Sequence, residues 1–345
     1  MWSRVGADAD GGTSVKVLVT GGAGYIGSHV VKALRDAGHR TAAYDSLIRG
    51  HRKAVLAEEF HQGELADRDR LREVIASFRP EAAIHLAALT SVPESVAQPS
   101  LYYRQNVEAG LTLLEELARV GVGPFVFSSS AAVYGTPERV PVSEDATPRP
   151  INPYGETKLA VERMLHWMAG PHGFRALSLR YFNASGCDPA GEIGEDHDPE
   201  THLIPLVYLA AAGRRGRLTV YGDDYDTPDG TCVRDYVHVG DLAHAHVLAV
   251  EKLAGLGNGG FHEVLNLGAE RGYSVLEVIW AVEKVLGRPV PYEFGPRRPG
   301  DPAVLVASSA KARAELGWRP TRSDLETIIR TGWAWHEKHP HGYDD

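Results

Sequence analysis

A tyrosine and a lysine four positions apart, Tyr154 and Lys158, have the clearest chemical use in the chain. They open a predicted helix that runs to about Met168, and residues four apart share one face of a helix. A tyrosine phenol has a pKa of about 10, and a nearby ammonium favours the phenolate, so we expect Lys158 to lower that pKa. Tyr154 would then take a proton from a substrate hydroxyl while its carbon is oxidised. Such a pair alone is usually a solvated surface pair, but Ser130, which closes a serine triplet 24 residues upstream, favours the catalytic interpretation.

A glycine-rich turn near the start of the chain is the first element that would position these side chains. Residues 15–19 form an apolar run of strand length, Gly21, Gly24 and Gly27 follow at intervals of three, and residues 28–37 have a helical pattern. Strand, glycine turn and helix together predict a dinucleotide site, where the free N–H groups of the helix hold a pyrophosphate. Glycine spacing alone is a weak signal, because a sheet-to-helix turn that binds no ligand can show the same spacing.

An acidic residue in the expected place indicates which dinucleotide binds. Asp45 ends the next predicted strand, residues 40–44, and lies 18 residues after Gly27. Its carboxylate can accept hydrogen bonds from the adenosine ribose and would repel a 2′-phosphate, which favours NAD over NADP. Arg49, Arg52 and Lys53 keep NADP open, although a solvated basic loop is the preferred interpretation of these three residues.

Alternating strand and helix patterns predict an α/β fold built on a doubly wound parallel (Rossmann) sheet, with ligands at the carboxyl ends of the strands. Further strands are expected to end near residue 63 and at 82–86 and 124–127, with helices at 67–78 and 99–120. After Gly186 the regular alternation of strands and helices gives way to an acidic, glycine-rich segment. Beyond it we predict helices at 202–212, 237–252, 275–286 and 325–336 and a strand at 264–267. We therefore predict a flexible tail (1–14), an NAD-binding Rossmann domain (15–185, with a return segment near 231–255) and a smaller mixed α/β substrate-binding lobe (mostly 186–345).

Composition narrows the classes of partner. The 345 residues include 36 basic and 45 acidic side chains, and the resulting charge of −9 disfavours nucleic acid and anionic membranes. We see no apolar run of transmembrane length. Two cysteines, Cys187 and Cys232, imply no disulfide framework and fit a reducing cytoplasm, where we expect the protein.

Two clusters resemble metal sites, but we expect no metal at either. In the first, His238, Asp241, His244 and His246 fall on a predicted helix, where His244 and His246 cannot share a face. The second, residues 223–230, resembles a calcium loop but has proline at a ligand position. A turn beside the substrate pocket is the preferred interpretation of that segment.

Ten segments together resemble the extended short-chain dehydrogenase/reductase family, and within it the UDP-glucose 4-epimerases. They cover nearly the whole chain after the tail: TGGAGYIGSH (20–29), DSLIRGHR (45–52), HLAALTSVPESV (85–96), SSSAAVYG (128–135), PYGETK (153–158), LRYFNASG (179–186), GEIGEDHDPETHLIP (191–205), VYGDDYDTPDGTCVRDYVHVGDLAHAH (220–246), RRPGD (297–301) and HPHGYDD (339–345). The glycine and tyrosine–lysine motifs specify only the larger family, whereas the RYFN, 220–246 and RRPGD segments are far more specific. The resemblance implies reversible inversion of a UDP-hexose at C4 through a 4-keto intermediate with tightly bound NAD, in galactose metabolism.

The resemblance also implies roles for individual residues. Tyr154 would be the base and acid, Lys158 its electrostatic partner and a ligand of the nicotinamide ribose, and Ser130 the donor to the reacting oxygen. The implied NAD site is Gly21, Gly24, Tyr25, Ile26, Gly27, Asp45, Ser46, Leu47, Glu64, Leu65, Leu86, Ala87, Ala88, Thr90, Asn106, Ser128, Tyr154, Lys158, Tyr181 and Phe182. The implied UDP-sugar site is Ser130, Tyr154, Asn183, His202, Leu203, Thr219, Val220, Tyr221, Arg234, Arg298 and Asp301.

Four positions depart from some relatives. Glu64 stands for aspartate, Thr90 for a lysine and His202 for an asparagine; Leu305, intermediate in size, leaves acceptance of N-acetylated UDP-sugars open. A 4,6-dehydratase would carry Asp-Glu after the serine, where this chain has alanines at 131 and 132. A UDP-glucuronate enzyme and a catalytically silent NAD-binding regulator remain as alternatives.

The resemblance further implies a homodimer formed through two helices of the first lobe. A stripe of Leu111, Leu114 and Leu117 and the region of Leu159 and Met164 would supply a four-helix contact. Core packing explains such stripes equally well.

Overall fold

A computed structural model describes residues 14–257, 259–298 and 301–344. The predicted tail, apart from Ser14, lies outside the described residues, and so do positions 299 and 300 of the RRPGD segment.

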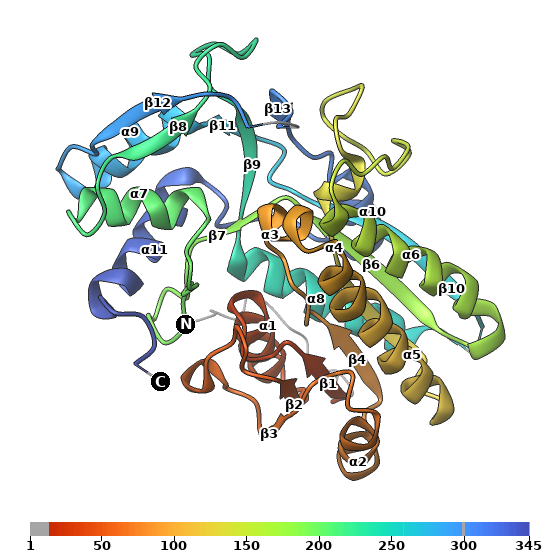
Figure 1. The fold of residues 1–345 in the computed structure, drawn as a ribbon. Helices are drawn as coiled ribbons and strands as arrows, with labels where there is room; N and C mark the ends of the chain where they lie inside the picture. Colours follow the sequence, from red (N-terminus) through yellow and green to blue (C-terminus); the bar gives the residue numbers. More distant parts are fainter. Residues whose placement is uncertain (1–13, 258, 299–300, 345) are drawn as a thin grey trace.

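A parallel sheet of seven strands forms the centre of the larger half of the molecule (Figure 1). Its strands follow the order β10-β6-β5-β4-β1-β2-β3, and each neighbouring pair is parallel. The strands are β1 (Lys16–Thr20), β2 (Arg40–Asp45), β3 (Glu59–Gln62), β4 (Ala82–His85), β5 (Pro124–Ser130), β6 (Arg175–Tyr181) and β10 (Phe261–Leu267). The predicted doubly wound Rossmann sheet is confirmed, with its switch point between β1 and β4, where ligands bind in such sheets.

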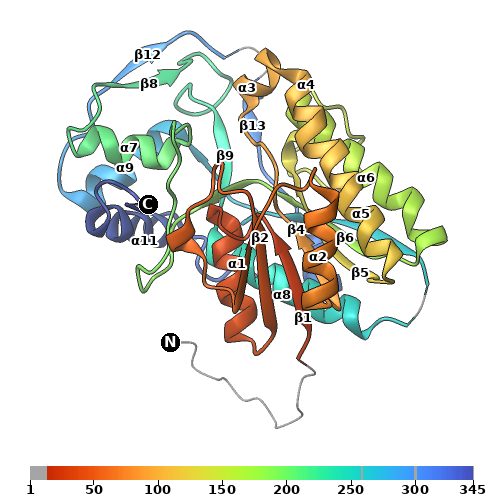
Figure 2. The same cartoon turned by 60° about the horizontal axis from the view of Figure 1, so that its bottom comes forward.

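Helices cover both faces of this sheet (Figure 2), so its central strands β1, β4 and β5 are mostly buried, whereas the edge strand β3 is only partly buried. On one face α1 (Tyr25–Asp36) and α8 (Val239–Gly255) pack together and share a core with β1, β4, β6 and β10. On the other face α2 (Arg68–Phe78), α5 (Ala109–Arg119) and α6 (Pro153–His172) share a second core. Asp67 caps α2 by accepting a hydrogen bond from the Arg70 N–H at 3.0 Å, as its sequence position predicts.

The helix predicted over residues 99–120 is interrupted by a π-helical segment. It begins as α4 (Pro99–Tyr102), continues as the π-helix Tyr103–Glu108 and ends as α5; the short α3 (Val92–Ala97) precedes it. A π turn shifts the residues that follow it around the helix axis and frequently marks a functional position. Asn106, one of the predicted cofactor residues, lies inside this segment.

The smaller half contains two further sheets with helices packed beside them. Its largest core joins α7, α9 and α11 to β8, β9 and β11. The strands are β7 (Asn183–Ser185), β8 (Leu218–Tyr221), β9 (Val233–His238), β11 (Gly272–Ser274), β12 (Tyr292–Gly295) and β13 (Val304–Leu305). The helices are α7 (Leu203–Ala211), α9 (Val275–Leu286) and α11 (Leu325–Lys338), whereas α10 (Ala310–Leu316) packs on β10 and α8 of the larger half.

Two predicted helix starts are wrong. Val237 and His238 belong to β9, and α8 begins at Val239 because the His238 side chain caps it by accepting from the Gly240 N–H. The first helix begins at Tyr25 rather than at residue 28, so the last glycine of the motif, Gly27, already lies inside α1.

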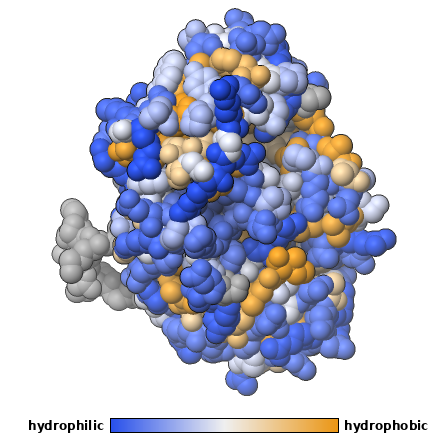
Figure 3. Space-filling view, turned by 60° about the vertical axis from the view of Figure 1, so that its left-hand side comes forward, coloured by the Kyte–Doolittle hydropathy of each residue, from blue (hydrophilic) through white to orange (hydrophobic). Residues whose placement is uncertain are grey.

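The surface carries its apolar residues in separate patches. Figure 3 shows a mostly hydrophilic face on which the hydrophobic areas are divided from one another. Scattered apolar residues of this kind are normal on a folded protein. Over the three described ranges, none of the helices combines the length and apolar character needed to cross a membrane.

Candidate functional site

The glycine turn packs tightly against the end of β4. Gly21 has a φ of +76°, and a Cβ built there would lie 2.5 Å from the backbone nitrogen of Ala87. A Cβ at Gly27 would lie 1.9 Å from the carbonyl oxygen of Gly21. Only glycine fits at these two positions, so the spacing in the sequence reflects a real close approach of three backbone segments.

The N-terminus of α1 is left open toward this turn. Its N-cap residue is Gly24, and within the described residues no side chain caps the helix. The free N–H groups of a first turn attract an anion, so this end of α1 suits a pyrophosphate. Tyr25, the first helical residue, donates its hydroxyl proton to the carbonyl oxygen of Gly186 at 2.5 Å and thereby links the turn to the smaller half.

Asp45 lies at the end of β2 beside the same turn. Its carboxylate accepts hydrogen bonds from the N–H groups of Ala23 (3.0 Å) and Leu47 (2.9 Å), which fix its direction and leave lone pairs on both oxygens. Burial raises the pKa of Asp45, while those hydrogen bonds act to lower it. The group is thus placed to accept from a ribose diol.

The basic residues that kept NADP open are engaged elsewhere. Arg49 donates to the carbonyl oxygen of Asp198 (2.7 Å) and pairs with Glu94 (3.3 Å). Arg52 lies over the ring of Phe60, and Lys53 donates to the carbonyl oxygen of Asp344. These contacts favour NAD, because a 2′-phosphate would need at least one of the three cations turned toward the ribose.

The other predicted cofactor residues line the neighbouring strand ends with different exposure. Glu64 is exposed and its carbonyl oxygen accepts from Tyr44, whereas Leu65 is buried. Asn106 is buried and holds the segment after β4 through Leu89 N–H (2.8 Å), Leu89 C=O (3.0 Å) and Thr157 (3.0 Å). Residues half-buried or exposed at this edge are Ser46, Leu47, Leu86, Ala87, Ala88 and Thr90.

The proposed catalytic residues meet where β5 ends and α6 begins. Ser130 is the last residue of β5, and its hydroxyl accepts from the Ala132 N–H at 3.1 Å. Asn152 caps α6 by accepting from the Gly155 N–H at 2.9 Å, which fixes the first turn of that helix and hence Tyr154. The ammonium of Lys158 lies 5.8 Å from the centre of the Tyr154 ring and donates to the Ser128 carbonyl oxygen at 2.8 Å.

The predicted lowering of the tyrosine pKa does not occur in the protein alone. Burial raises the pKa of Tyr154, and the hydrogen bond with Ser130 only partly opposes that rise. Burial also lowers the pKa of Lys158 to about 7, although Glu162 favours its charged form. Burial of the phenol dominates, and the Lys158 ammonium lies over the ring face and donates its hydrogen bond to the Ser128 carbonyl oxygen.

A buried ion pair behind these residues was not predicted. Glu162 lies one helical turn after Lys158 and accepts from Arg180 at 2.6 Å and 2.9 Å and from the Ser129 hydroxyl at 2.5 Å. Both charged side chains are 4% exposed, so together they fix α6 against β5 and β6. The available signal was the spacing of Glu162 four residues after Lys158.

Tyr181 and Phe182 follow one another at the end of β6 but have different surroundings. The Tyr181 hydroxyl hydrogen bonds with His246 at 2.5 Å, and burial raises its pKa. Phe182 is half-buried and packs on a small cluster that contains Tyr134 and Leu305. Tyr181 is therefore buried in the core close to Ser128 and Tyr154, whereas Phe182 is only partly buried.

The predicted UDP-sugar residues come from three segments of the smaller half. Asn183 begins β7, Leu203 begins α7, and residues 219–221 (Thr219, Val220 and Tyr221) lie on β8. His202 precedes α7 and donates to the Glu195 carboxylate; partial burial acts to lower its pKa, but Glu195 outweighs this and raises it to about 9. Val220 is buried in the core, whereas Tyr221 is exposed, so of these two side chains Tyr221 is the one that a ligand can reach.

The arginines predicted to bind phosphate are held by local partners. Arg234 donates to the carbonyl oxygens of Val233 (2.9 Å) and Pro302 (2.8 Å) and lies 3.5 Å from the Asp301 carboxylate. Arg298 lies 4.0 Å from the centre of the Tyr221 ring, which joins β8 to the RRPGD segment. A planar, permanently charged guanidinium in this position can still donate to phosphate oxygens with its other N–H groups.

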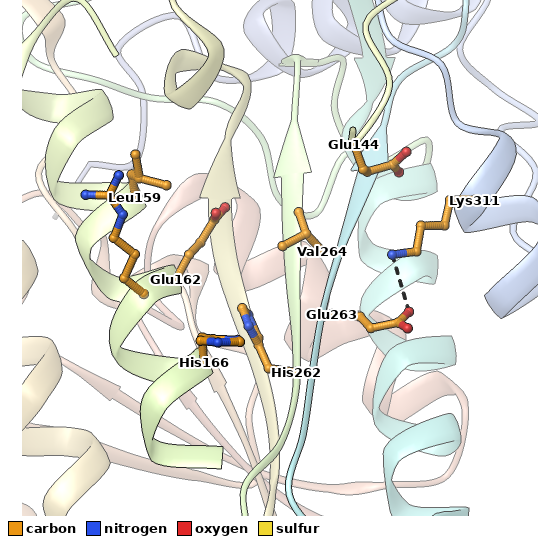
Figure 4. A pocket seen from close by; sticks show the side chains of 9 residues that line it. Glu144, Leu159, Glu162, His166, His262, Glu263, Val264 and Lys311 are labelled. Carbon is orange, nitrogen blue, oxygen red and sulfur yellow. Dashed lines mark ion pairs between the residues drawn. The ribbon is translucent and has the colours of Figure 1, made fainter. Parts of the chain in front are cut away.

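A shallow, open pocket of about 380 Å³ lies elsewhere, between α6, β10 and α10 (Figure 4). Its polar lining includes His166, His262 and Glu263, and Lys311 pairs with Glu263 at 3.4 Å. None of the predicted catalytic, cofactor or UDP-sugar residues lines it. We therefore place the functional site at the strand ends rather than in this pocket.

The first of the two metal-like clusters serves the structure. Asp241 accepts from Arg322 N–H (2.9 Å) and from Ser323 (2.7 Å), while His246 is bound by Tyr181 and the Leu242 carbonyl oxygen. His238 caps α8. In the second segment, Tyr225 N–H donates to the Gly230 carbonyl oxygen at 2.9 Å, which makes it a closed turn.

Comparisons with known proteins agree along almost the entire chain. Residues 17–268 match the NAD dependent epimerase/dehydratase family. The UDP-glucose 4-epimerase of Lacticaseibacillus casei is 48% identical over 330 residues, which cover 95% of this chain and 99% of that protein. The crystal structure of the Brucella ovis UDP-glucose 4-epimerase in complex with NAD has a TM-score of 0.90 and 49% identity, covering 93% and 98% of the two chains. The Bifidobacterium longum UDP-glucose 4-epimerase in complex with NAD⁺ and UDP has a TM-score of 0.89 and 39% identity, covering 95% and 100%.

Proposed function

The chain belongs to the NAD dependent epimerase/dehydratase family, and from that premise we propose that it interconverts UDP-glucose and UDP-galactose at C4 with Tyr154, Ser130 and Lys158 around the reacting carbon. The observation that carries this assignment of roles is the convergence of Tyr154, Ser130 and Lys158 at the carboxyl end of β5. Its activity is that of an NAD-dependent isomerase.

The residues present fit NAD. The open N-terminus of α1, the glycine turn that a Cβ would fill and the oriented Asp45 carboxylate would hold its pyrophosphate and adenosine ribose. When bound, NAD supplies the reversible two-electron oxidation of the sugar at C4. Lys158 would also donate to the nicotinamide ribose.

Tyr154 exchanges one proton with the C4 hydroxyl, removing it on oxidation and returning it on reduction. Ser130 donates to the same substrate oxygen and holds it against the phenol. In its protonated form Lys158 supplies positive charge that stabilises the phenolate. Burial lowers the pKa of Lys158 to about 7, so its amine also loses that proton more easily than a solvated lysine does. The Glu162–Arg180 pair keeps α6, and with it both residues, at a fixed height above the sheet.

Inversion requires that the nucleotide stay anchored while the 4-keto sugar turns to present its other face. Arg234, Arg298 and Asp301 with residues 219–221 of β8 would hold the UDP, and Asn183, His202 and Leu203 would close the site from the other side. The support is their common placement on the smaller half and the engagement of Arg298 with Tyr221. A firmly held nucleotide and a loosely held hexose are the two conditions that this mechanism needs.

The division of labour follows the same lines. We assign NAD binding to residues 15–185 with a return near 231–255, where α8 packs on α1, and UDP-sugar binding mostly to residues 186–345. The strand β10 adds to that return. Both cysteines are free thiols, which suits a cytoplasmic location.

We also propose a homodimer through the outer faces of the adjacent π-α5 and α6 helices. Leu114, Leu117 and Leu159 are buried in the core, so only Leu111 of the predicted stripe faces outward, together with Tyr103 and Trp167. Leu111→Asp should shift the sedimentation coefficient from a dimer to a monomer, because a charge would be buried in the contact. Ile48→Asp, an exposed apolar residue of a loop, is the matched control and should leave the dimer intact.

The alternative substrate class is an N-acetylated UDP-hexose, admitted if Leu305 leaves room beside Phe182. Incubation with UDP-galactose, UDP-GalNAc and UDP-glucuronate, followed by NMR of the products, tests all of these. We expect conversion of UDP-galactose. Comparable conversion of UDP-GalNAc would support the alternative. Conversion of UDP-glucuronate alone would reassign the enzyme to that substrate. Turnover of none of the three would overturn the proposed function. A dehydratase is disfavoured because Ala131 and Ala132 follow Ser130 in a 3₁₀ turn.

A further inference from the structure

The segment between β7 and α7 brings together four side chains of the kinds that bind transition metals. Glu195, His197, Glu200 and His202 each contribute one ligand atom, and these atoms all lie within 4.8 Å of one another. They alternate along eight residues of chain that form neither helix nor strand. Two imidazoles and two carboxylates form a donor set that Zn²⁺ takes in tetrahedral sites.

The separations fit coordination by one ion. His197 Nδ1 lies 3.5 Å from Glu195 Oε1 and 3.6 Å from Glu200 Oε2. Ligands about 2.0–2.2 Å from a tetrahedral zinc lie roughly 3.3–3.6 Å from one another. A third pair, His202 and Glu195, is in direct hydrogen-bond contact, so the ring of His202 would move back slightly to admit the ion.

One ligand atom is buried and directed at two of the other ligands. Within the described residues, His197 Nδ1 is buried and makes no hydrogen bond of ordinary geometry, and its contacts are the longer ones to the carboxylates of Glu195 and Glu200. A buried polar atom left in this way is uncommon and calls for an explanation. The two carboxylates are also well buried, with Glu195 5% and Glu200 11% exposed, whereas the half-exposed His202 leaves a path from solvent.

Neighbouring groups hold the ligands in place. The backbone N–H groups of Thr201 and His202 donate to Glu200 Oε1 at 2.6 Å and 2.7 Å, which directs Oε2 toward His197. Tyr343 braces the same segment by bonding to the Gly194 N–H and to Asp196, each at 2.8 Å, and Figure 1 places the C-terminal end beside it. Oriented second-layer contacts of this kind raise metal affinity.

We propose that Glu195, His197, Glu200 and His202 bind one divalent transition-metal ion, with Zn²⁺ as the probe. The site lies between the two halves of the proposed catalytic centre. The ring of Tyr25, the first residue of α1, contacts His197 at 6.2 Å, and His202 directly precedes α7. A bound ion would therefore tie the dinucleotide turn to the UDP-sugar side and order the segment between them.

The test measures Zn²⁺ binding to the full-length, tag-free protein after dialysis against a chelator. Calorimetry should give one equivalent per chain, and Mg²⁺ should not compete, because it prefers all-oxygen ligands. His197→Gln and Glu200→Gln should each weaken Zn²⁺ binding by about 100-fold or more and should remove the rise in melting temperature caused by Zn²⁺. His61→Gln is the matched control, since His61 also lies beside a glutamate, Glu59, at 3.2 Å.

Circular dichroism of each variant separates lost binding from lost folding, and the Glu200→Gln chain serves if the His197 chain does not fold. Substoichiometric or multi-site binding that is equally weakened by His61→Gln would overturn the proposal, and so would unchanged Zn²⁺ affinity in both cluster variants. These readouts do not depend on turnover, so the metal site and the proposed function can fail separately.

Discussion

The catalytic edge of the large sheet and the arginine-bearing surface of the smaller half are built in different ways. Tyr154, Lys158 and Ser130 are held by a strand end, a capped helix and a buried ion pair. Arg234 and Arg298 are held by a backbone carbonyl, a carboxylate and an aromatic ring contributed by separate strands and loops. The first region is positioned by contacts within the protein, as proton transfer requires, whereas the second keeps spare donors for an anion.

Removing the phenol hydroxyl is the strongest test of the first region. Tyr154→Phe should lower kcat for UDP-galactose by about 10³-fold, because general acid–base catalysis contributes roughly 10²–10⁴-fold. Steady-state assays and measurement of the dissociation constant of UDP for the same variant separate an effect on chemistry from an effect on nucleotide binding. Near-normal turnover would remove the catalytic role from Tyr154 and with it the contrast between the two regions.

Removing an arginine should have a smaller effect, confined to binding. Arg234→Leu should weaken UDP binding by about 30-fold, or about 2 kcal/mol, since a charge-assisted contact to phosphate is lost. Arg297→Leu is the control, because Arg297 pairs with Asp224 at 2.5 Å and lies over Tyr225. Equal losses in the two variants would mean that the arginines act only through net charge.

The last prediction concerns the pH dependence of stability rather than catalysis or binding. An unfolded lysine keeps its proton to about pH 10, whereas burial lowers the pKa of Lys158 to about 7. Between these values the unfolded chain binds the extra proton, so the free energy of unfolding rises with pH by at most about 1.4 kcal/mol per unit. Urea unfolding of the cofactor-stripped wild type and of Lys158→Met is compared at pH 7, 8 and 9. The free energy of unfolding of the wild type should rise relative to that of Lys158→Met as the pH increases. A constant difference would mean that Lys158 stays charged in the fold.

The same contrast explains what could be predicted from the sequence. The glycine turn, the Asp45 strand end and the Tyr154–Lys158 spacing are local patterns, and the predicted elements lie close to the observed ones. The starts of α8 and α1 were missed because the N-caps, His238 and Gly24, set where each helix begins, whereas the spacing of apolar residues does not. The Tyr154 pKa is raised because the phenol is buried, and the spacing of Tyr154 and Lys158 along the helix cannot specify that burial.

Long-range assembly was the part beyond prediction. The short strands β7, β11 and β13 have too few residues for a pattern, and they exist because β9 offers them a partner. The metal-like cluster at 195–202 was missed for a related reason, since an irregular segment has no periodicity from which side-chain directions follow. The Glu162–Arg180 pair likewise joins residues whose contact depends on how α6 lies across the sheet.

The position of β10 has a consequence for how the polypeptide matures. This strand closes one edge of the seven-stranded sheet beside β6, yet it is residues 261–267 of the chain. During synthesis β6 must therefore wait, with an unpaired and aggregation-prone edge, until about eighty further residues have left the ribosome. A fragment that ends after β7 would lack β10 and leave the edge of β6 unpaired. We therefore expect that the dinucleotide half does not fold stably on its own.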